Sequence, residues 1–180
     1  RSGSPRQRSP FVVAPKKVYS GDIAMYYSYY HSPAGILRME SDGENLTGLY
    51  FDEKMEYQYG DLAVFSLVRN WLNAYFCGHP YEPDFSIHLT GTPFQQQVWQ
   101  ILRTIPYGQT ITYGDIARET AVRTEKMKMS AQAVGQAVGR NPVSIIIPCH
   151  RVVGSGGRLT GYAGGLQKKE WLLRHEGWLK

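Results

Sequence analysis

The residues with the clearest chemical potential are Cys149, His150 and Arg151, which end the stretch 141–151, Asn-Pro-Val-Ser-Ile-Ile-Ile-Pro-Cys-His-Arg. The β-branched residues 145–147 predict a buried strand, and Pro148, which has no N–H for a sheet, predicts its end. A lone cysteine is more often an inert core residue. Here the two basic neighbours favour thiolate, the form that reacts. The pattern therefore predicts a nucleophile held where a rigid strand stops.

An extended chain would place the side chains of Cys149 and His150 on opposite sides, because adjacent residues of a strand alternate. Direct contact between thiol and imidazole is then excluded. A water between the two side chains, or a bend after Pro148, would restore the connection.

With its flanks, this motif resembles methylated-DNA-[protein]-cysteine S-methyltransferase, the 6-O-alkylguanine-DNA alkyltransferase family. The resemblance covers about residues 92–177 and rests on Asn141-Pro142, Pro148 to Val153, Gly161 to Gly165 and Lys169 to Glu176. It implies DNA repair by direct reversal, in which the Cys149 thiolate takes the alkyl group from 6-O-alkylguanine, and from 4-O-alkylthymine, in a flipped-out base. A thioether is not hydrolysed, so the protein would act once. The implied partner is double-stranded DNA, with no cofactor, no metal and no membrane, and the protein is expected to be a monomer.

The resemblance also assigns roles. His150 would take the thiol proton through water, Glu176 would orient the imidazole, Tyr113 would protonate the departing guanine, and Asn141 would act as a hinge beside the base pocket. The residues implied to bind the substrate are Tyr162, Gly164, Val152 and Ala163. Arg151 is interpreted as a structural ion-pair residue. The residues implied to contact DNA are Gln132, Ala131, Arg140, Tyr113, Lys128 and Arg123.

Two positions depart from the family pattern. Gln132 stands where an arginine commonly enters the base stack, which predicts weaker or more salt-tolerant DNA binding, with Lys126 and Lys128 compensating through phosphates. Ala163 stands at the position of a lid serine and removes one hydrogen bond to the leaving oxygen.

Two other functions remain open on the residues alone. A non-catalytic sensor of alkylated DNA would bind its lesion reversibly, but the presence of Cys149, His150 and Glu176 argues against it. A Cys-His hydrolase would need an oxyanion hole and would turn over many times.

Charge is divided unevenly along the 180 residues, whose formal net charge is +5. Residues 1–17 carry five basic and no acidic residues, residues 18–91 carry three basic and ten acidic ones, and residues 92–180 carry twelve basic and five acidic ones. A basic half beside an acidic half indicates that one half meets a polyanion.

Two cysteines exclude a disulfide framework or a four-cysteine zinc site. They fit an intracellular compartment, cytoplasmic or, in a eukaryote, nuclear. No apolar run approaches a membrane span, and no signal peptide is expected.

The fold class predicted is α+β. Residues 1–17 form a flexible basic tail. In the N-terminal domain, residues 18–91, short β-favouring runs between Ile23 and Phe51 predict a three-stranded antiparallel meander, and apolar spacing from Leu62 to Phe76 predicts a covering helix. The resemblance makes this domain ribonuclease H-like. Cys77, at the end of that helix, is interpreted as structural.

The C-terminal domain, residues 92–180, is predicted to be a winged helix-turn-helix. Thr92, Pro93 and Gln95 predict a capped helix start. Helices are expected from Tyr113 to about Thr120, from Ser130 to about Gly139, and from about Leu166 to His175. Gly135 and Gly139, in the helix expected from Ser130 to about Gly139, indicate close packing against another helix or close approach of DNA. The strand at Ile145 and the return through Leu159 to Tyr162 would supply the wing.

Overall fold

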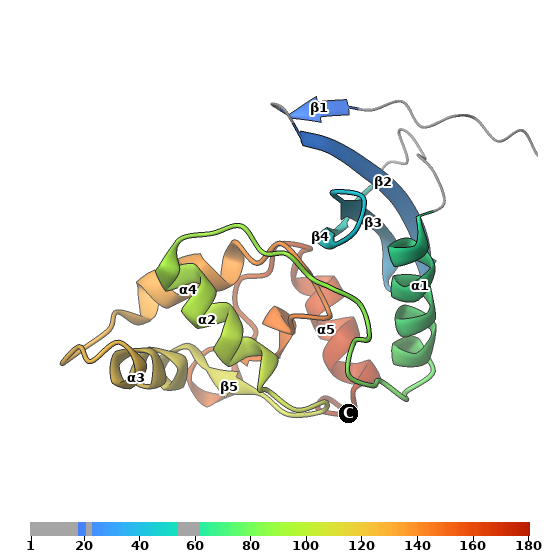
Figure 1. Cartoon of the computed structure of the whole chain (residues 1–180). Helices are drawn as coiled ribbons and strands as arrows, with labels where there is room; N and C mark the ends of the chain where they lie inside the picture. The colour runs from blue at the N-terminus through green and yellow to red at the C-terminus, as the bar shows by residue number, and fades with distance from the viewer. Residues whose placement is uncertain (1–17, 21–22, 54–61) are drawn as a thin grey trace, which may run out of the picture.

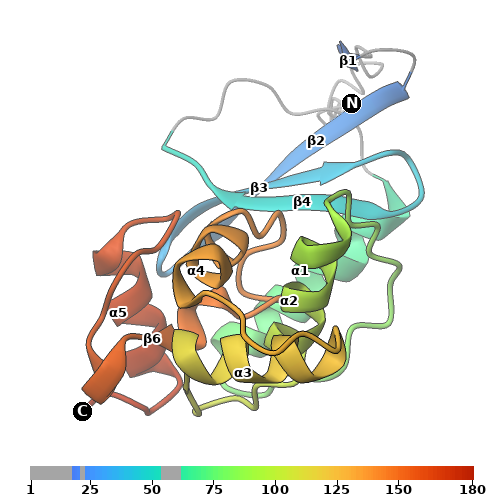
Figure 2. The ribbon, with the colours of Figure 1, turned by 90° about the vertical axis from the view of Figure 1, so that its left-hand side faces the viewer.

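The computed structural model describes residues 18–20, 23–53 and 62–180. The tail predicted over residues 1–17 lies outside them. In the described part, a curved sheet lies over a group of helices, with the chain's C-terminus on the helical side (Figures 1 and 2). No helix of the described residues is long and apolar enough to cross a membrane.

The sheet is an antiparallel meander in the order β1-β2-β3-β4, with strands β1 (Val18–Ser20), β2 (Ile23–Ser32), β3 (Gly35–Ser41) and β4 (Leu46–Phe51). The predicted three-stranded meander is confirmed as β2 to β4, and β1 adds a short edge strand. Along β3, Leu37, Met39 and Ser41 are buried in alternation. That period of two turns one face of the sheet toward the core.

Helix α1 (Ala63–Phe76) packs beneath the sheet (Figure 1). Its buried residues Val64, Phe65, Val68, Leu72 and Tyr75 recur at three- and four-residue spacing, which places them on one helical face. This face joins a hydrophobic core that also includes side chains of the C-terminal half, so the two halves share their interior.

Three helices with capped N-termini begin the C-terminal half: α2 (Pro93–Arg103), α3 (Tyr113–Arg123) and α4 (Ala131–Gly139). Thr92 and Gln95 form the predicted capping box of α2, and Thr112 and Asp115 form an equivalent box at α3. Helix α3 runs three residues beyond the predicted end. Helices α3 and α4 form the helix-turn-helix, and the turn between them extends away from the rest of the molecule (Figure 1).

The strand predicted over residues 145–147 is wrong. The chain there forms a turn in which Ile145 has a left-handed φ of 69°, and only Val143 makes a bridge, to Leu49 of β4. The N–H of Leu49 donates to the carbonyl of Pro142 at 2.8 Å, and the N–H of Ser144 donates to the carbonyl of Leu49 at 2.8 Å. The isoleucines reflect burial within a turn that begins at the sheet edge, because burial alone selects apolar residues whatever the backbone conformation.

The wing is also built differently from the prediction. Its strands are β5 (Ile111–Thr112) and β6 (Val152–Val153), which pair in parallel. The turn after β6 contains the short 3₁₀ helix η2 (Ser155–Gly157), and residues 158–162 form no strand. Helix α5 (Leu166–His175) closes the fold with the predicted bounds.

Candidate active site around Cys149

A tight turn presents Cys149. Residues Cys149–Arg151 form the 3₁₀ helix η1, with the N–H of Cys149 donating to the carbonyl of Ile147 at 2.8 Å and the N–H of Arg151 donating to Pro148 at 3.0 Å. The chain therefore bends after Pro148. An extended chain, which would have put the Cys149 and His150 side chains on opposite sides of a strand, is excluded. All three side chains of η1 are buried.

The Cys149 thiol is 5% exposed and has a specific hydrogen-bond partner. The Asn141 amide donates to Sγ at 3.1 Å and to the carbonyl of Ile147 at 2.7 Å, while its Oδ1 accepts from the N–H of Val143 at 3.0 Å. One side chain thus holds both ends of the turn and the sulfur. Asn141 was predicted as a hinge residue, and its contact with the thiol was not foreseen.

The thiol is not activated in the way its neighbours in the sequence suggested. Burial raises the pKa of Cys149, and the hydrogen bond from Asn141 and the charge of Lys169 oppose that rise. Arg151 does not act on the sulfur, because its guanidinium is committed elsewhere. Without a substrate, the protein therefore holds Cys149 as a thiol.

The carboxylate of Glu176 binds the side chains of both His150 and Arg151. Its Oε1 lies 2.7 Å from His150 Nε2, and Arg151 donates from Nε to Oε2 at 2.8 Å and from Nη2 to Oε1 at 3.0 Å. The N–H of Gly108 donates to Oε2 at 3.1 Å. The interpretation of Arg151 as an ion-pair residue is confirmed.

These contacts set the charge of both partners. Burial opposes ionisation of Glu176, but the hydrogen bonds and charges of His150 and Arg151 outweigh it and hold the pKa of the carboxyl well below its usual range. Burial lowers the pKa of His150 despite the carboxylate beside it. His150 Nδ1 has no hydrogen-bond partner among the described residues. A neutral imidazole with Nε2 donating to Glu176 leaves Nδ1 as a proton acceptor.

A cavity of about 200 Å³ opens onto the thiol. It is lined by Tyr113, Gly135, Val138, Gly139, Cys149, Gly161, Tyr162 and Ala163. Four segments thus form its walls: the first residue of α3, the glycine-bearing face of α4, η1, and the loop that precedes α5. The cavity is smaller than a site for a drug-sized ligand, roughly 300–1,000 Å³, so only a small group can enter it.

The two glycines of α4 are not required by tight helix packing. A Cβ at Gly135 would meet the Tyr113 ring at 3.8 Å, which is ordinary contact, and a Cβ at Gly139 would meet nothing within 4 Å. Both residues instead line the cavity. Of the two explanations open from the sequence, these contacts do not support close helix packing, and close approach of DNA stays a prediction.

The residues predicted to bind the substrate divide into two groups. Tyr162 and Ala163 line the cavity. Gly164 lies behind them, where a Cβ would approach Phe51 of β4 to 2.7 Å. Val152 is buried in β6 and its carbonyl accepts a hydrogen bond from Lys169 at 2.5 Å, so it is not a wall of the cavity.

The residues predicted to contact DNA lie on the helix-turn-helix. Ala131 and Gln132 are exposed in the first turn of α4, and Lys128 is exposed in the turn before it. Arg140 is exposed at the C-terminal end of α4, and Arg123 forms an ion pair with Glu119 on α3. Tyr113 lies apart from them in the cavity, where its hydroxyl donates to the carbonyl of Thr160 at 3.3 Å.

Sequence reasoning missed Lys169. This residue of α5 is fully buried, and its ammonium donates to the carbonyls of Val152, Thr160 and Gly161, the last two at 2.7 and 3.3 Å. It ties the loop bordering the cavity to β6. Burial lowers the pKa of Lys169 to about 8. The signal was its spacing of three and four residues from the apolar Leu172 and Leu173, which places a lysine on the buried face.

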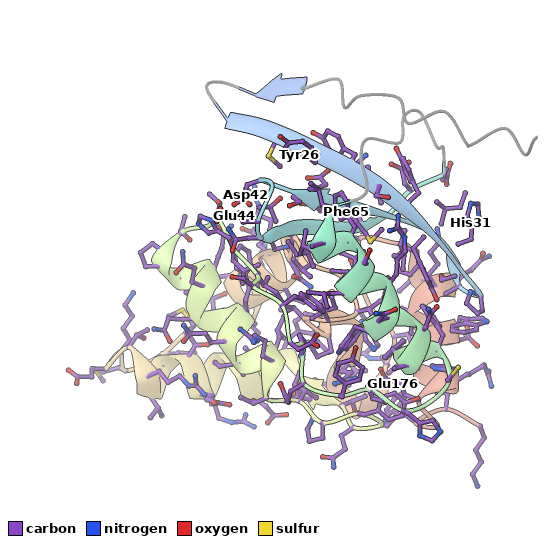
Figure 3. The ribbon with its side chains drawn as sticks, turned by 45° about the vertical axis from the view of Figure 1, so that its right-hand side comes forward. Tyr26, His31, Asp42, Glu44, Phe65 and Glu176 are labelled. Carbon is purple, nitrogen blue, oxygen red and sulfur yellow. The ribbon has the colours of Figure 1, made fainter. Side chains whose placement is uncertain are left out.

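A second missed residue is Tyr75, which was assigned only to the apolar face of α1. Its hydroxyl donates to Glu176 Oε1 at 2.7 Å across 101 positions of sequence. Figure 3 shows Glu176 beside the C-terminal end of α1. Nothing in a helical apolar pattern distinguishes a tyrosine with a buried partner from one that only packs.

Comparison with known proteins shows which protein family the chain is similar to. Residues 25–89 match the family model for the ribonuclease-like domain of 6-O-methylguanine DNA methyltransferase, and residues 93–178 match the model for its DNA-binding domain. A methylated-DNA–protein-cysteine methyltransferase of Haemophilus influenzae is 44% identical over 167 residues, which cover 85% of this chain and 87% of that protein. A relative from Methanosarcina acetivorans is 42% identical and is covered over 99% of its length.

Solved structures agree with these sequence relatives. A crystal structure of the Mycobacterium tuberculosis protein in complex with DNA has a TM-score of 0.73 and 44% identity, with 84% of this chain and 92% of that chain covered. The match thus extends over both the sheet and the helix-turn-helix, including the motif that holds the buried thiol. By its sequence and its fold alike, the chain belongs to the 6-O-methylguanine DNA methyltransferase family.

Proposed function

We propose that this protein repairs DNA by moving the methyl group of 6-O-methylguanine onto the sulfur of Cys149. The observation that carries the proposal is the position of Sγ. It borders a cavity of about 200 Å³, it accepts a hydrogen bond from Asn141, and the next residue of η1 is His150, which is paired with Glu176. A nucleophile, a proton acceptor and a group that orients the acceptor are the parts that nucleophilic catalysis requires.

The reaction follows from the charges of these groups. The thiol proton passes through a water to Nδ1 of His150, and the imidazolium that forms is stabilised at Nε2 by Glu176. The thiolate attacks the methyl carbon, the S–C bond forms as the C–O6 bond breaks, and the electron pair of that bond moves to guanine. The hydroxyl of Tyr113, which faces the cavity, supplies a proton to the guanine ring. Guanine then leaves as a neutral base.

The product explains why the protein acts once. A thioether is stable to water, and no group in the site is placed to remove the methyl from sulfur. The same chemistry would accept an alkyl group from 4-O-alkylthymine, because the reacting carbon is again bonded to an exocyclic oxygen.

The target base must leave the duplex to reach Cys149, because the thiol is buried. Extruding a base costs a few kcal/mol, and less for a damaged, badly paired one. In helix α4, Ala131 and Gln132 are exposed in the first turn, and Gly135 and Gly139 line the cavity one and two turns further along the same face. We assign Gln132 to the base stack, with Lys128, Arg123 and Arg140 near phosphates.

We further propose that the chain divides at about residues 91–92 into an acidic domain and a basic, DNA-facing domain. The protein works as a monomer, and it works inside the cell, cytoplasmic or, in a eukaryote, nuclear, because that is where its DNA substrate lies.

Intact-mass measurement tests the proposed reaction. After incubation with a duplex containing one 6-O-methylguanine, the protein should gain the mass of one methylene unit, since a methyl group replaces a proton, and peptide mapping should place it on Cys149. An unmodified duplex is the control. Reversible binding with no mass gain would instead identify a sensor, and repeated ester turnover without DNA affinity would identify a hydrolase.

Gln132→Arg tests whether the first turn of α4 faces DNA. An added guanidinium should tighten binding and make the slope of log affinity against log salt more negative by up to about 0.9, the value for one further phosphate contact. Titration of a labelled duplex at several salt concentrations measures this slope. Gln100→Arg, which adds the same charge to an exposed position on α2, should change the slope less. Equal slopes for the two variants would place Gln132 away from DNA.

A further inference from the structure

The buried hydroxyl of Tyr75 links the N-terminal half to the proton path of the site. Its oxygen donates to Glu176 Oε1 at 2.7 Å, and the same carboxylate oxygen lies 2.7 Å from His150 Nε2. Three donors therefore share this oxygen, Tyr75 from α1 and His150 and Arg151 from η1. Each added donor takes up part of the negative charge of the carboxylate and so weakens its interaction with the imidazole.

The position of the Tyr75 ring is fixed on several sides. Tyr75 is 0% exposed and stacks on Trp71 with ring centroids 5.5 Å apart. Edge contacts with Phe76 and Tyr107 have centroid distances of 5.1 and 5.9 Å, and His175 lies at 5.3 Å. The hydroxyl consequently has little freedom to turn from the carboxylate.

Tyr75 also remains protonated, and therefore a donor, at neutral pH. Burial, followed by the nearby charge of Glu176, raises the pKa of Tyr75 far above its ordinary value. The hydroxyl is thus a permanent neutral partner for the carboxylate, while His150 changes its charge during the reaction.

The other charged groups around His150 are already committed. Arg151 of η1 binds both carboxylate oxygens, and Lys169 of α5 donates to three carbonyls. Cys149 is held as a thiol, and Tyr107 donates to the carbonyl of His175 at 3.3 Å. Of the groups facing the His150–Glu176 pair from the N-terminal half of the described chain, Tyr75 is the one with a hydrogen bond to it.

We propose that Tyr75 is a positioning residue that limits the basicity of His150 by sharing Glu176 Oε1, and so keeps Cys149 protonated until an alkylated base fills the cavity. This role presupposes the proposed methyl transfer, because it concerns the same proton path. It matters for a protein that acts once, since reaction of the thiol with a stray electrophile would consume the molecule without repair.

Tyr75→Phe isolates the hydroxyl, because the packed ring remains. Without the competing donor, Glu176 should act more strongly on His150, so the pKa of His150 should rise, as followed by NMR of labelled histidine. The rate of Cys149 alkylation by iodoacetamide at pH 7 should rise roughly three- to tenfold, since a hydrogen bond to a charged group is worth on the order of a factor of ten. Every protein carries Cys77→Ser, because that exposed thiol would also react.

Tyr107→Phe is the matched control. It removes a hydroxyl from the same aromatic cluster whose partner is a backbone carbonyl, so both readouts should stay at their wild-type values. Site-specific replacement of Tyr75 by a fluorinated tyrosine, whose hydroxyl donates more strongly, should move both readouts in the opposite direction. General loosening of the fold, monitored by thermal melting, cannot produce shifts of opposite sign.

The result that overturns this role is a Tyr75→Phe protein whose His150 titration and alkylation rate match those of the wild type, or change together with those of Tyr107→Phe. Neither measurement uses DNA. A wild-type protein that took no methyl group from modified DNA would refute the proposed function separately.

Discussion

Cys149→Ser should abolish methyl transfer while leaving DNA binding intact. A hydroxyl at this position occupies less space than the thiol and can still accept the hydrogen bond that Asn141 donates to Sγ at 3.1 Å. Serine is a far weaker nucleophile, because its hydroxyl is not deprotonated by a neutral imidazole at ordinary pH without further activation. We expect the first-order transfer rate to fall by more than roughly 10⁴-fold, as for other lost nucleophiles. Affinity for a methylated duplex should change by less than about twofold, since Gln132, Lys128, Arg123 and Arg140, which we propose contact DNA, lie outside the cavity.

Rapid-quench kinetics with a radiolabelled methyl group measures the rate, and a fluorescent duplex measures affinity. The chain supplies its own control in Cys77→Ser, since Cys77 is an exposed thiol at the end of α1. That variant should transfer the methyl group at the wild-type rate. Label retained by the Cys149→Ser protein, or lost from the Cys77→Ser protein, would move the nucleophile elsewhere.

Glu176→Gln should reduce both stability and transfer. The amide has nearly the shape of the carboxylate but no charge, so Arg151 stays buried without a counter-ion and the hydrogen bond to His150 loses its anionic partner. Breaking a buried ion pair from one side costs about 3–5 kcal/mol of unfolding free energy. Transfer should slow by roughly 10²- to 10⁴-fold, the larger value being that of a triad whose orienting carboxylate becomes an amide.

The pH dependence of stability gives an independent signature. Folding lowers the pKa of Glu176, so the unfolded chain takes up a proton that the folded protein excludes, and wild-type stability decreases as pH falls through the ordinary carboxyl range near roughly 4.3. The stabilisation is fully present above that range. Folding also lowers the pKa of His150, which adds a loss of stability beginning near roughly pH 6.5. In Glu176→Gln, the loss in the carboxyl range should be reduced.

Urea unfolding followed at several pH values measures both effects. Glu170→Gln is the control on the same helix, because Glu170 forms an exposed ion pair with Arg174. Exposed pairs of this kind contribute about 0–1 kcal/mol. A Glu176→Gln protein as stable as Glu170→Gln would show that the buried carboxylate does not hold the site together.

Local chemistry made much of this fold predictable. The capping box at Thr92, the spacing of apolar residues on α1 and the antiparallel meander depend mainly on residues close in sequence, and the structure has them where they were predicted. Arg151 was also predicted to form an ion pair, and its partner is Glu176.

Contacts between distant parts of the chain were not predictable in the same way. Residues 145–147 have the composition of a strand, but the chain just before them pairs with Leu49 of β4, nearly 100 positions earlier, and then turns. The buried roles of Tyr75 and Lys169 depend on partners that only the folded chain brings near. Without those partners, a tyrosine on an apolar face predicts packing, and a lysine in a helix predicts a solvated surface.

The junction between β4 and the turn at residues 142–144 has a consequence for expression of separate fragments. An edge strand with free backbone donors and acceptors is a template for pairing with other chains. In the whole protein, the N–H and carbonyl of Leu49 are occupied by Pro142 and Ser144. Cut from the C-terminal half, the meander would expose this edge together with the apolar face beneath it, so the isolated fragment should self-associate into insoluble aggregates.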